Sequence, residues 1–265
     1  MGGPAATTSP WKLTLSDGNV TRSGLWKDVN RGPAEGGPDL WRYDAAAYEM
    51  DVLLGLGMVP PTVERTYLGR YGSLQLWIED VERLADRMAR GPDSLSVGAE
   101  EWDRKAFLQR VFDSLIANDD RNLNNILIGS GDRMMILIDH SRAFHTEEPY
   151  VKTLLYGAAG ARRTGDGSPY PFSRLPRLFV EKLRGLDAAS VKDAVKRHLN
   201  AKEIQALLAR RDLILKEIDE PRAAKVMEIL TDEQKAKYKE LLGEPFDTSG
   251  IFQRGQGRGG RGGGN

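Results

Sequence analysis

Residues 118–125 read Asn-Asp-Asp-Arg-Asn-Leu-Asn-Asn, and the pair Ile138-Asp139 follows them closely. The segment before them, residues 102–117, carries its apolar side chains on one face and is predicted to be a buried helix. The segments after them, residues 125–128 and 134–138, are short apolar runs around a Gly-Ser-Gly-Asp turn, which predicts a β-hairpin. The polar loop therefore precedes the first strand of the hairpin, and the aspartate follows the second strand.

Three polar side chains of this segment are suited to phosphoryl transfer. Asn125 and Asp139 are expected to lie close together because a hairpin brings its ends side by side, and amide and carboxylate oxygens suit Mg²⁺. Asp120, on the same loop, supplies an acceptor for a hydroxyl proton. Phosphoryl transfer needs metal ions on the phosphates, oxygen ligands for those ions and such an acceptor. The pattern predicts a Mg-ATP phosphotransfer site of the kinase type.

A polar turn is the alternative interpretation of the same residues. Asn and Asp are common in turns because their side chains bond to nearby backbone groups. The run Ile136-Leu137-Ile138 argues against it, since a strand of the buried type carries Asp139 to an interior edge. A buried acid needs a partner or a metal ion, so the functional interpretation is favoured.

The loop resembles the catalytic and metal-binding loops of atypical protein-kinase-like enzymes. The resemblance is carried by Asp120-Arg121-Asn122-Leu123-Asn124-Asn125-Ile126-Leu127 and by Ile138-Asp139-His140. These enzymes are the phosphatidylinositol kinases, the HipA-like bacterial kinases and the secretory-pathway protein kinases, and the chain is similar to bacterial members. No His-Arg pair precedes Asp120, which is the atypical form. The likeness extends over about residues 11–218, including residues 44–51, 59–61 and 72–77.

The resemblance implies an α+β, two-lobed protein-kinase-like fold that binds ATP between the lobes with Mg²⁺ or Mn²⁺. Residues 1–80 would form a small β-rich N-lobe with one helix, and residues 81–220 a larger helical C-lobe. Residues 221–250 are expected to be a helical extension, and residues 251–265 a disordered Arg-Gly tail. A hydroxyl group of a protein Ser or Thr, a lipid or a small molecule would be the acceptor.

The resemblance also implies individual roles. Asp120 would be the catalytic base, Asn125 and Asp139 the metal ligands. The hinge that receives adenine would lie near Leu76 to Glu79, with its side chains forming part of the nucleotide site. The cofactor-binding residues there are Gln75, Leu76, Trp77, Ile78 and Glu79.

Lys27 occupies the place of the lysine that contacts the phosphates and pairs with an acid on the first helix. Asp44 stands where the family has a glutamate, and Glu49 is the alternative partner. A solvated lysine and a helix-dipole acid are the corresponding structural interpretations. The phosphate-covering glycine loop is the weakest part of the pattern, since only Gly2-Gly3 to Ser9 offers a remnant.

Two further residues next to the aspartates have supporting roles. Arg121 is expected to brace the loop by pairing with an acid such as Asp139, and it is counted with the catalytic residues. His140, in the triplet His140-Ser141-Arg142 that replaces Phe-Gly after the aspartate, is expected to be a packed or hydrogen-bonded histidine. Only three histidines and no cysteine occur in the chain, which disfavours a zinc site.

Hydrophobic periodicity and turn residues place the remaining elements. Residues 30–39 are expected to be a Gly/Pro loop and residues 146–173 a long polar loop. Strands are expected at residues 11–15, 20–29, 63–67 and 73–78, and helices at residues 44–56, 176–186, 188–199, 201–218 and 223–242. Asp187 and Asn200 are the expected caps of the third and fourth of these helices.

Composition excludes several classes of protein. The formal net charge of the 265 residues is zero, so attraction to nucleic acid or anionic membrane is not built into the chain. No run is long enough to span a bilayer, and Met1 to Pro10 does not resemble a signal peptide. A cytoplasmic location is the default, and an extracytoplasmic one follows if an N-terminal signal is missing.

Two other classes of function stay open at this point. A pseudokinase would keep the fold and bind nucleotide without turnover, which the weak glycine loop and Asp44 favour and the intact aspartates oppose. A nucleic-acid role would rest on weak binding by the tail, through Arg254, Arg258 and Arg261. The pair Arg162-Arg163 would face an anionic acceptor or, by default, solvent.

Overall fold

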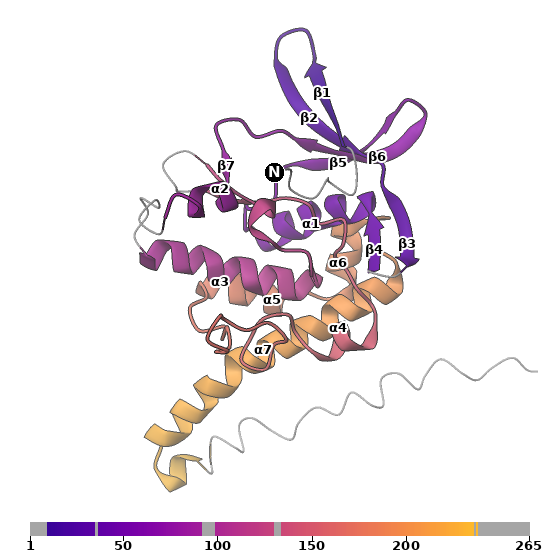
Figure 1. Cartoon of the computed structure of the whole chain (residues 1–265). Coiled ribbons are helices and arrows are strands. Elements are labelled where there is room, and N and C mark those ends of the chain that lie inside the picture. The colour runs from indigo at the N-terminus through magenta and orange to yellow at the C-terminus, as the bar shows by residue number, and fades with distance from the viewer. Residues whose placement is uncertain (1–9, 35–36, 92–98, 130–133, 236, 238–265) are drawn as a thin grey trace, which may run out of the picture. The chain divides into compact units, whose positions relative to one another are not determined.

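A computed structural model of the chain describes residues 10–34, 37–91, 99–129, 134–235 and 237 (Figure 1). A small β-rich lobe is followed by a larger, mostly helical lobe, and both belong to one compact unit, Met1–Asp219. Glu220–Asn265 forms a second unit. The expected glycine loop, residues 130–132 of the hairpin turn, most of residues 236–242 and the Arg-Gly tail lie outside the described residues.

The small lobe is built on an antiparallel sheet with the strand order β1-β2-β6-β5. Its strands are β1 (Trp11–Ser16), β2 (Thr21–Lys27), β5 (Thr62–Tyr67) and β6 (Arg70–Leu76), close to the expected ranges. Asp17 closes the first turn, because its Oδ1 accepts hydrogen bonds from two following amides at 2.9 and 2.8 Å. Lys27 is the last residue of β2, one of the two central strands, and it pairs in register with Ser73 of β6, the other central strand.

Residues 30–34 and 37–40 form a separate two-stranded sheet, so the loop expected at residues 30–39 was wrong. β3 (Asn30–Ala34) pairs antiparallel with β4 (Gly37–Leu40) with one shift of register. Both strands of such a ribbon are edge strands, where Gly and Pro are tolerated. The end of β4 is tied to the helical lobe, because the Leu40 amide donates to the Ser141 carbonyl at 2.8 Å.

Helix α1 (Trp41–Leu54) begins earlier than the expected Asp44 and ends at Gly55. Gly55 has a φ of 69°, a left-handed conformation that glycine adopts without strain at a helix C-terminus. The buried carboxylate of Asp51 then accepts hydrogen bonds from the three amides of residues 57–59, at 2.9 to 3.1 Å. These bonds fix the turn that leads from α1 towards β5.

The helical lobe contains a three-stranded sheet, β7-β8-β9, beside its helices. Its elements are β7 (Glu82–Arg83), α2 (Leu84–Met88), α3 (Ala99–Ile116), η2 (Leu123–Asn125), β8 (Ile126–Ile128), β9 (Met135–Leu137), α4 (Glu148–Lys152), α5 (Arg177–Arg184), α6 (Ala188–Val195) and α7 (Ala201–Ile229). Asp187 caps α6 by accepting from the Ser190 amide at 2.7 Å, and Asn200 caps α7 by accepting from the Glu203 amide at 3.0 Å.

Two expectations in this lobe need correction. The short helix α4 lies inside the segment expected to be a loop, and it begins with a proline in its first turn, where proline is favoured. Helix α7 runs through Pro221 to Ile229, where two separate helices were expected. A single proline removes one backbone hydrogen bond, and the four residues after it, Arg-Ala-Ala-Lys, have a high helix propensity that favours continuation of the helix.

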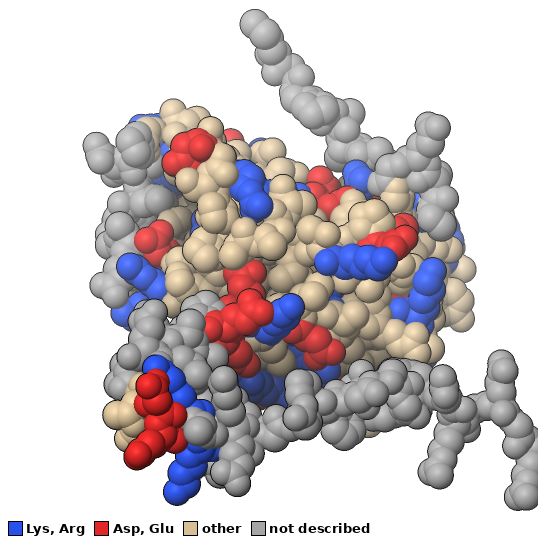
Figure 2. All heavy atoms as spheres, turned by 90° about the horizontal axis from the view of Figure 1, so that it is seen from below, with Lys and Arg blue, Asp and Glu red and all other residues tan. Residues whose placement is uncertain are grey.

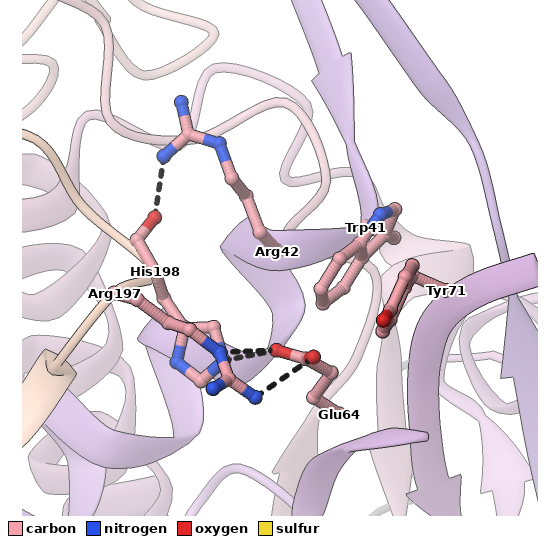
Figure 3. Close-up of a pocket in the computed structure, with 6 residues that line it drawn as sticks. All are labelled: Trp41, Arg42, Glu64, Tyr71, Arg197 and His198. Carbon is pink, nitrogen blue, oxygen red and sulfur yellow. Dashed lines mark hydrogen bonds and ion pairs between the residues drawn. The ribbon is translucent and has the colours of Figure 1, made fainter. Parts of the chain in front are cut away.

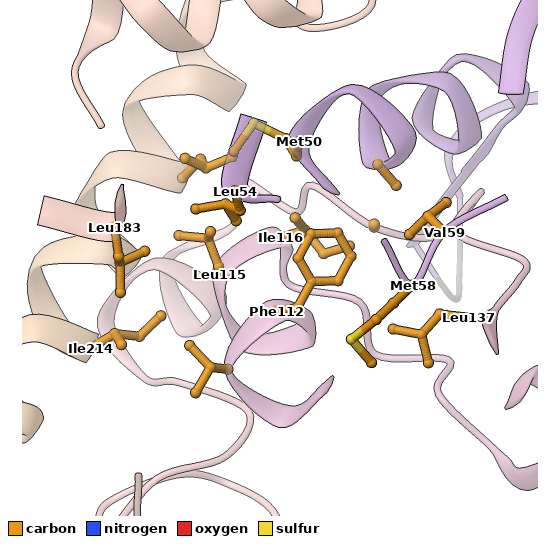
Figure 4. Close-up of a cluster of buried hydrophobic side chains, with 14 of the residues drawn as sticks. Met50, Leu54, Met58, Val59, Phe112, Leu115, Ile116, Leu137, Leu183 and Ile214 are labelled. Carbon is orange, nitrogen blue, oxygen red and sulfur yellow. The ribbon is translucent and has the colours of Figure 1, made fainter. Parts of the chain in front are cut away.

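The main hydrophobic core joins α1 to the helical lobe (Figure 4). Met50 and Leu54 of α1 are almost fully buried against α3, whose Phe112, Leu115 and Ile116 are inaccessible to solvent. Burying a side chain of this size stabilises the folded state by about 1.5–3 kcal/mol. The core therefore holds α1, and the acid it carries, against the helical lobe.

Gly72 of β6 has no room for a side chain, which gives a first testable prediction. A Cβ there would overlap the Lys27 carbonyl oxygen and lie 2.7 Å from Trp26 Cε2. Gly72→Ala is expected to lower the free energy of unfolding by about 1–3 kcal/mol, because the central strands must move apart. Gly32→Ala is the control, since nothing lies within 4 Å of a Cβ at Gly32. Equal midpoints for both variants in chemical denaturation would contradict this packing.

Glu203 at the start of α7 ties the two lobes and gives a prediction for pH. Its carboxylate accepts from Arg42 at 2.6 and 2.9 Å and from the Tyr43 hydroxyl at 2.6 Å. Burial alone raises the pKa of Glu203, but these hydrogen bonds outweigh burial and hold the pKa below its ordinary value. A depressed carboxyl pKa stabilises the protein above the unfolded-state pKa and loses that contribution as pH falls through the folded-state pKa.

Glu203→Gln is therefore expected to flatten the loss of stability on acidification below about pH 4.3. The measurement is the free energy of unfolding from denaturant titrations at a series of pH values. A variant with the same slope as the parent would show that the carboxylate contributes no pH-dependent stability.

Candidate active site

Lys27 lies between two carboxylates that come from different lobes. Its Nζ is 2.8 Å from Asp139 Oδ1 and 3.4 Å from Asp44 Oδ2. The side chains of Lys27 and Asp44 are 10% and 2% exposed, whereas that of Asp139 is 37% exposed. Asp139 is therefore the residue of this cluster that solvent reaches most easily. The pairing expected between Lys27 and the first helix is made with Asp44. Glu49 lies instead where its charge acts on His198.

The charges of this cluster support one another. Burial alone lowers the pKa of Lys27, but the two carboxylates outweigh burial and raise it above the ordinary value. Burial raises the pKa of Asp44, which also accepts the His140 amide at 2.7 Å. Burial opposes the charge of Asp139 too, yet Lys27 holds the pKa of Asp139 below its ordinary value. The lysine is thus cationic, and Asp139 is ionised, at neutral pH.

The backbone at Asp139 has an unusual conformation. Asp139 has a φ of 58°, in the left-handed region that residues with a Cβ seldom occupy. Such conformations cost about 1–3 kcal/mol and are found where the surroundings impose them, often at functional sites. Here the neighbouring amides are fixed on both sides, since Ile138 N donates to the Asn125 carbonyl at 3.1 Å and His140 N to Asp44.

Asp120 and Asn125 lie on one tight loop after α3. Asn122 caps the 3₁₀ turn η2 by accepting from the Asn124 amide at 2.9 Å. The Asn125 Nδ2 atom donates to the Asp120 carbonyl at 3.0 Å, which leaves Oδ1 as the remaining polar atom of that buried side chain. The carboxyl of Asp120 is partly exposed, and burial raises its pKa above the ordinary value.

Arg121 braces the loop by pairing with an acid, as expected, but that acid is Asp113 and not Asp139. Its Nε and Nη2 atoms bind the two oxygens of Asp113 at 3.0 and 3.1 Å, in a bidentate ion pair that is almost fully buried. Its Nη1 atom donates to the carbonyls of Asn125 and Ile138 at 2.6 and 2.8 Å. Arg121 therefore braces both ends of the hairpin, immediately beside the two expected metal ligands.

Asp113 was missed by the reasoning from sequence. It is fully buried on α3, and it also accepts hydrogen bonds from Gln109 and from Asn118. The available signal was an acid among the apolar residues of a helix predicted to be buried. A buried acid needs such partners, and Arg121 lies only eight residues further along the chain.

His140 is a packed, hydrogen-bonded histidine in the structure. It is completely buried, and its Nε2 atom lies 2.8 Å from Arg121 Nη2. Burial and the nearby cations hold the pKa of His140 well below 6.5, so the ring is neutral and Nε2 accepts from the guanidinium. The ring therefore fills space and holds Arg121.

A cavity of about 470 Å³ opens beside these groups, at the expected hinge. Gln75, Leu76, Trp77 and Ile78 all line it. Other lining residues are Leu25, Pro60, Val81, Glu82, Arg83, Asp86, Leu127 and Ile138. Ile138 directly precedes Asp139 in the chain, so one wall of this mostly apolar cavity belongs to the segment that carries Asp139. Glu79 lines a different hollow and accepts from the Trp77 indole at 3.2 Å.

A second cavity, of about 480 Å³, lies where α1 begins and α6 ends (Figure 3). Arg197 and His198 face the carboxylate of Glu64, with Arg197 bound to both oxygens at 2.8 Å and His198 Nε2 at 3.6 Å. The rings of Trp41 and Tyr71 lie side by side across the hollow. These ion pairs tie β5 of the small lobe to the turn before α7.

The site suits a metal ion that is shared with phosphate oxygens. Among the described residues, no group of three or more His, Asp or Glu side chains is arranged to hold a metal. Mg²⁺ takes one or two carboxylates and completes its shell with water and substrate phosphates. The Asp139 carboxylate and the Asn125 amide oxygen fit that requirement.

Among the residues that the structure describes, no helix is both long and apolar enough to cross a bilayer.

Comparisons with known proteins agree with this geometry at the level of fold. No family model matches the chain. Protein Rv2133c of Mycobacterium tuberculosis is 27% identical over 162 residues, which is 48% of this chain and 58% of that protein, so the chain spans less than two thirds of this relative. The match shows sequence similarity without placing the chain in a named family.

Solved structures of atypical kinases share the fold. The Helicobacter pylori proinflammatory kinase CtkA matches with a TM-score of 0.54 and 12% identity, over 87% of this chain and 95% of that one. The Golgi casein kinase with Mn/ADP bound matches with a TM-score of 0.53 and 14% identity, over 82% and 71%. The expected two-lobed α+β kinase-like fold is thereby confirmed.

Proposed function

We propose that the protein is an ATP- and metal-dependent phosphotransferase that transfers the γ-phosphoryl group to a hydroxyl acceptor. The observation that carries the proposal is the pairing of Lys27 with Asp44 and Asp139, directly after Ile138 in the wall of the hinge cavity. A buried cation and an open, ionised carboxylate side by side are the groups that hold triphosphate oxygens and their metal ion. The kinase-like fold of CtkA and of the Golgi casein kinase supports it.

Each part of the nucleotide has a matching surface. Adenine occupies the apolar cavity lined by residues 75–78, and Lys27 binds the phosphates. Asn125 and Asp139 hold Mg²⁺ or Mn²⁺, which neutralises charge on the phosphates when bound. The Golgi casein kinase with Mn/ADP bound, a protein of the same fold, supports the choice of nucleotide and metal.

Asp120 acts on the acceptor. As the acceptor oxygen attacks the γ-phosphorus, the Asp120 carboxylate takes the hydroxyl proton, the bond to the bridging oxygen of ADP breaks, and ADP leaves. The role needs an ionised carboxylate open to an acceptor, and Asp120 is partly exposed. Arg121 holds the same loop in place, because it binds the buried Asp113 and donates to the carbonyls of Asn125 and Ile138.

The proposal is tested by incubating the purified chain with γ-labelled ATP and either Mg²⁺ or Mn²⁺. Three acceptors distinguish the chemical classes: dephosphorylated casein, phosphatidylinositol vesicles and a small polyol, with autophosphorylation measured alone. Asp139→Asn is run in parallel, and ADP binding is measured with metal and with a chelator. The expected result is metal-dependent labelling of one acceptor class, lost together with metal-dependent ADP binding in Asp139→Asn.

Nucleotide binding in the parent without transfer to any acceptor would favour the pseudokinase alternative. Metal-dependent ADP binding that survives in Asp139→Asn would overturn the assignment of the site. The nucleic-acid alternative draws no support from the face in Figure 2, where Lys and Arg are interspersed with Asp and Glu. Weak binding of RNA by the tail stays a separate prediction.

A further inference from the structure

Arg162 contacts the backbone on both sides of Asp120. Its Nη2 atom donates to the carbonyl of Asp119, and its Nη1 atom to the carbonyl of Arg121 at 3.3 Å. The Nη1 atom also donates to the Tyr156 hydroxyl at 2.9 Å, and the guanidinium lies 5.3 Å from the centre of that ring. The side chain expected to face solvent or an anionic acceptor is thus bound to the loop that carries the proposed base.

The segment that presents Arg162 is fixed to the helical lobe. The amide of Arg162 donates to the Leu155 carbonyl at 2.8 Å, and the amide of Tyr156 donates to Ser114 Oγ of α3 at 3.0 Å. A Cβ at Gly160 would overlap the backbone of Tyr156, so this turn closes tightly around a residue without a side chain. Tyr156 and Arg162 are therefore held at one place relative to α3.

A second anchor holds the same loop from α7. The carboxylate of Glu217 accepts from the amides of Ala158 and Phe172, at 2.8 and 3.2 Å. The Gly157 amide donates to the Tyr170 carbonyl at 3.0 Å and closes the base of the loop. The position of the Arg162 guanidinium is consequently set by two helices, α3 and α7, and not by the flexibility of its own side chain.

From this geometry we propose that Arg162 is a positioning residue for Asp120, an inference that rests on the proposed phosphotransfer function. A planar guanidinium presents several donors in a fixed arrangement, and here two of them hold the carbonyls of the residues before and after Asp120. The Asp120 carbonyl between them is held by Asn125 Nδ2 at 3.0 Å, and together these bonds fix the direction in which the Asp120 side chain leaves the backbone. Small misplacements of a catalytic group cost large factors in rate. In this role Arg162 acts through the loop that carries Asp120.

Arg163 provides a matched control. It is the next residue, carries the same charge, is exposed, and its Nη1 atom donates to the Arg162 carbonyl at 3.3 Å. It makes no bond to the Asp120 loop among the interactions found in the described part of the chain. The contrast between the two arginines therefore separates positioning from a general effect of positive charge on this surface.

The test compares Arg162→Ala, Arg162→Lys and Arg163→Ala in the labelled-ATP assay, with folding checked by thermal unfolding. Arg162→Ala is expected to lower kcat about 10–10²-fold and to leave the KM for ATP within about twofold, because nucleotide-binding groups are untouched. Arg162→Lys is expected to recover part of the rate, and so is Arg162→Ala with added guanidinium at concentrations far below those that unfold proteins. Arg163→Ala is expected to keep the parent kcat.

Each outcome decides the inference. A kcat for Arg162→Ala equal to that of Arg163→Ala, in a folded protein, overturns it. A loss of kcat that neither guanidinium nor Arg162→Lys relieves also overturns it, since that pattern indicates a general structural fault. An inactive parent is a failure of the proposed function and not of the positioning role, so the two failures are distinguishable.

Discussion

Replacing Asp120 with asparagine is expected to lower the rate of phosphoryl transfer about 10²–10⁴-fold, the range for loss of a positioned acid or base. Asparagine keeps the shape of the side chain but cannot take the hydroxyl proton. The backbone bonds from Arg162 and Asn125 to this loop do not depend on the Asp120 carboxylate, so the loop is expected to hold its form. Metal-dependent binding of ADP should persist, because the proposed ligands are Asn125 and Asp139.

The measurement is a progress curve with γ-labelled ATP and the best acceptor, together with an ADP titration of each variant. Asp193→Asn is a suitable control, since Asp193 is an exposed acid on α6. Transfer by Asp120→Asn at the parent rate would show that another group takes the proton. Loss of ADP binding in the same variant would instead mean that Asp120 helps to hold the nucleotide or its metal ion.

The centre of the candidate site was accessible from sequence because its residues are close along the chain. A β-hairpin brings its ends together, and the bond of 3.1 Å from the Ile138 amide to the Asn125 carbonyl is the result. The two proposed metal ligands are therefore neighbours through local geometry. Their roles stay predictions, whereas the contact of Asp139 with Lys27 and the position of Ile138 in the wall of the hinge cavity are observed.

The partner of Lys27 in the small lobe could not be predicted from the local sequence, because it depends on how α1 packs. Asp44 and Glu49 are five residues apart on α1, so their side chains point about 140° apart around a helix, and only one of them can face Lys27. The core decides which, because Met50 and Leu54 are buried in the main hydrophobic core while Asp44 contacts Lys27 of β2.

Contacts between distant segments were the hardest to foresee. Arg121 had several acids within reach, and the choice of Asp113 over Asp139 follows from tertiary packing, since Lys27 already occupies Asp139. Arg162 reads in sequence as half of a solvated basic pair. Only the fold of the 154–172 loop against α3 and α7 shows that it is bound to the loop that carries Asp120.

Asp113→Ala is expected to destabilise the protein by about 3–5 kcal/mol, the usual cost of removing one partner of a buried ion pair. The variant leaves the Arg121 guanidinium charged, because arginine does not deprotonate in proteins, and buried without its carboxylate. Gln109 and Asn118 also lose the acceptor that they share. Glu148→Ala on α4 is the control, because its pair with Lys152 is about 70% exposed and such pairs contribute about 0–1 kcal/mol.

A double replacement tests whether this ion pair has a role beyond stability. Buried pairs exchanged for apolar residues of similar size often leave stability unchanged, so Asp113→Leu with Arg121→Met should recover much of the lost free energy of unfolding. It should not recover phosphotransfer, because Arg121 also holds the carbonyls of Asn125 and Ile138, which methionine cannot do. A double variant that is both stable and fully active would show that the brace is dispensable. A stable but slow one would show that Arg121 orders the hairpin ends where the proposed metal ligands stand.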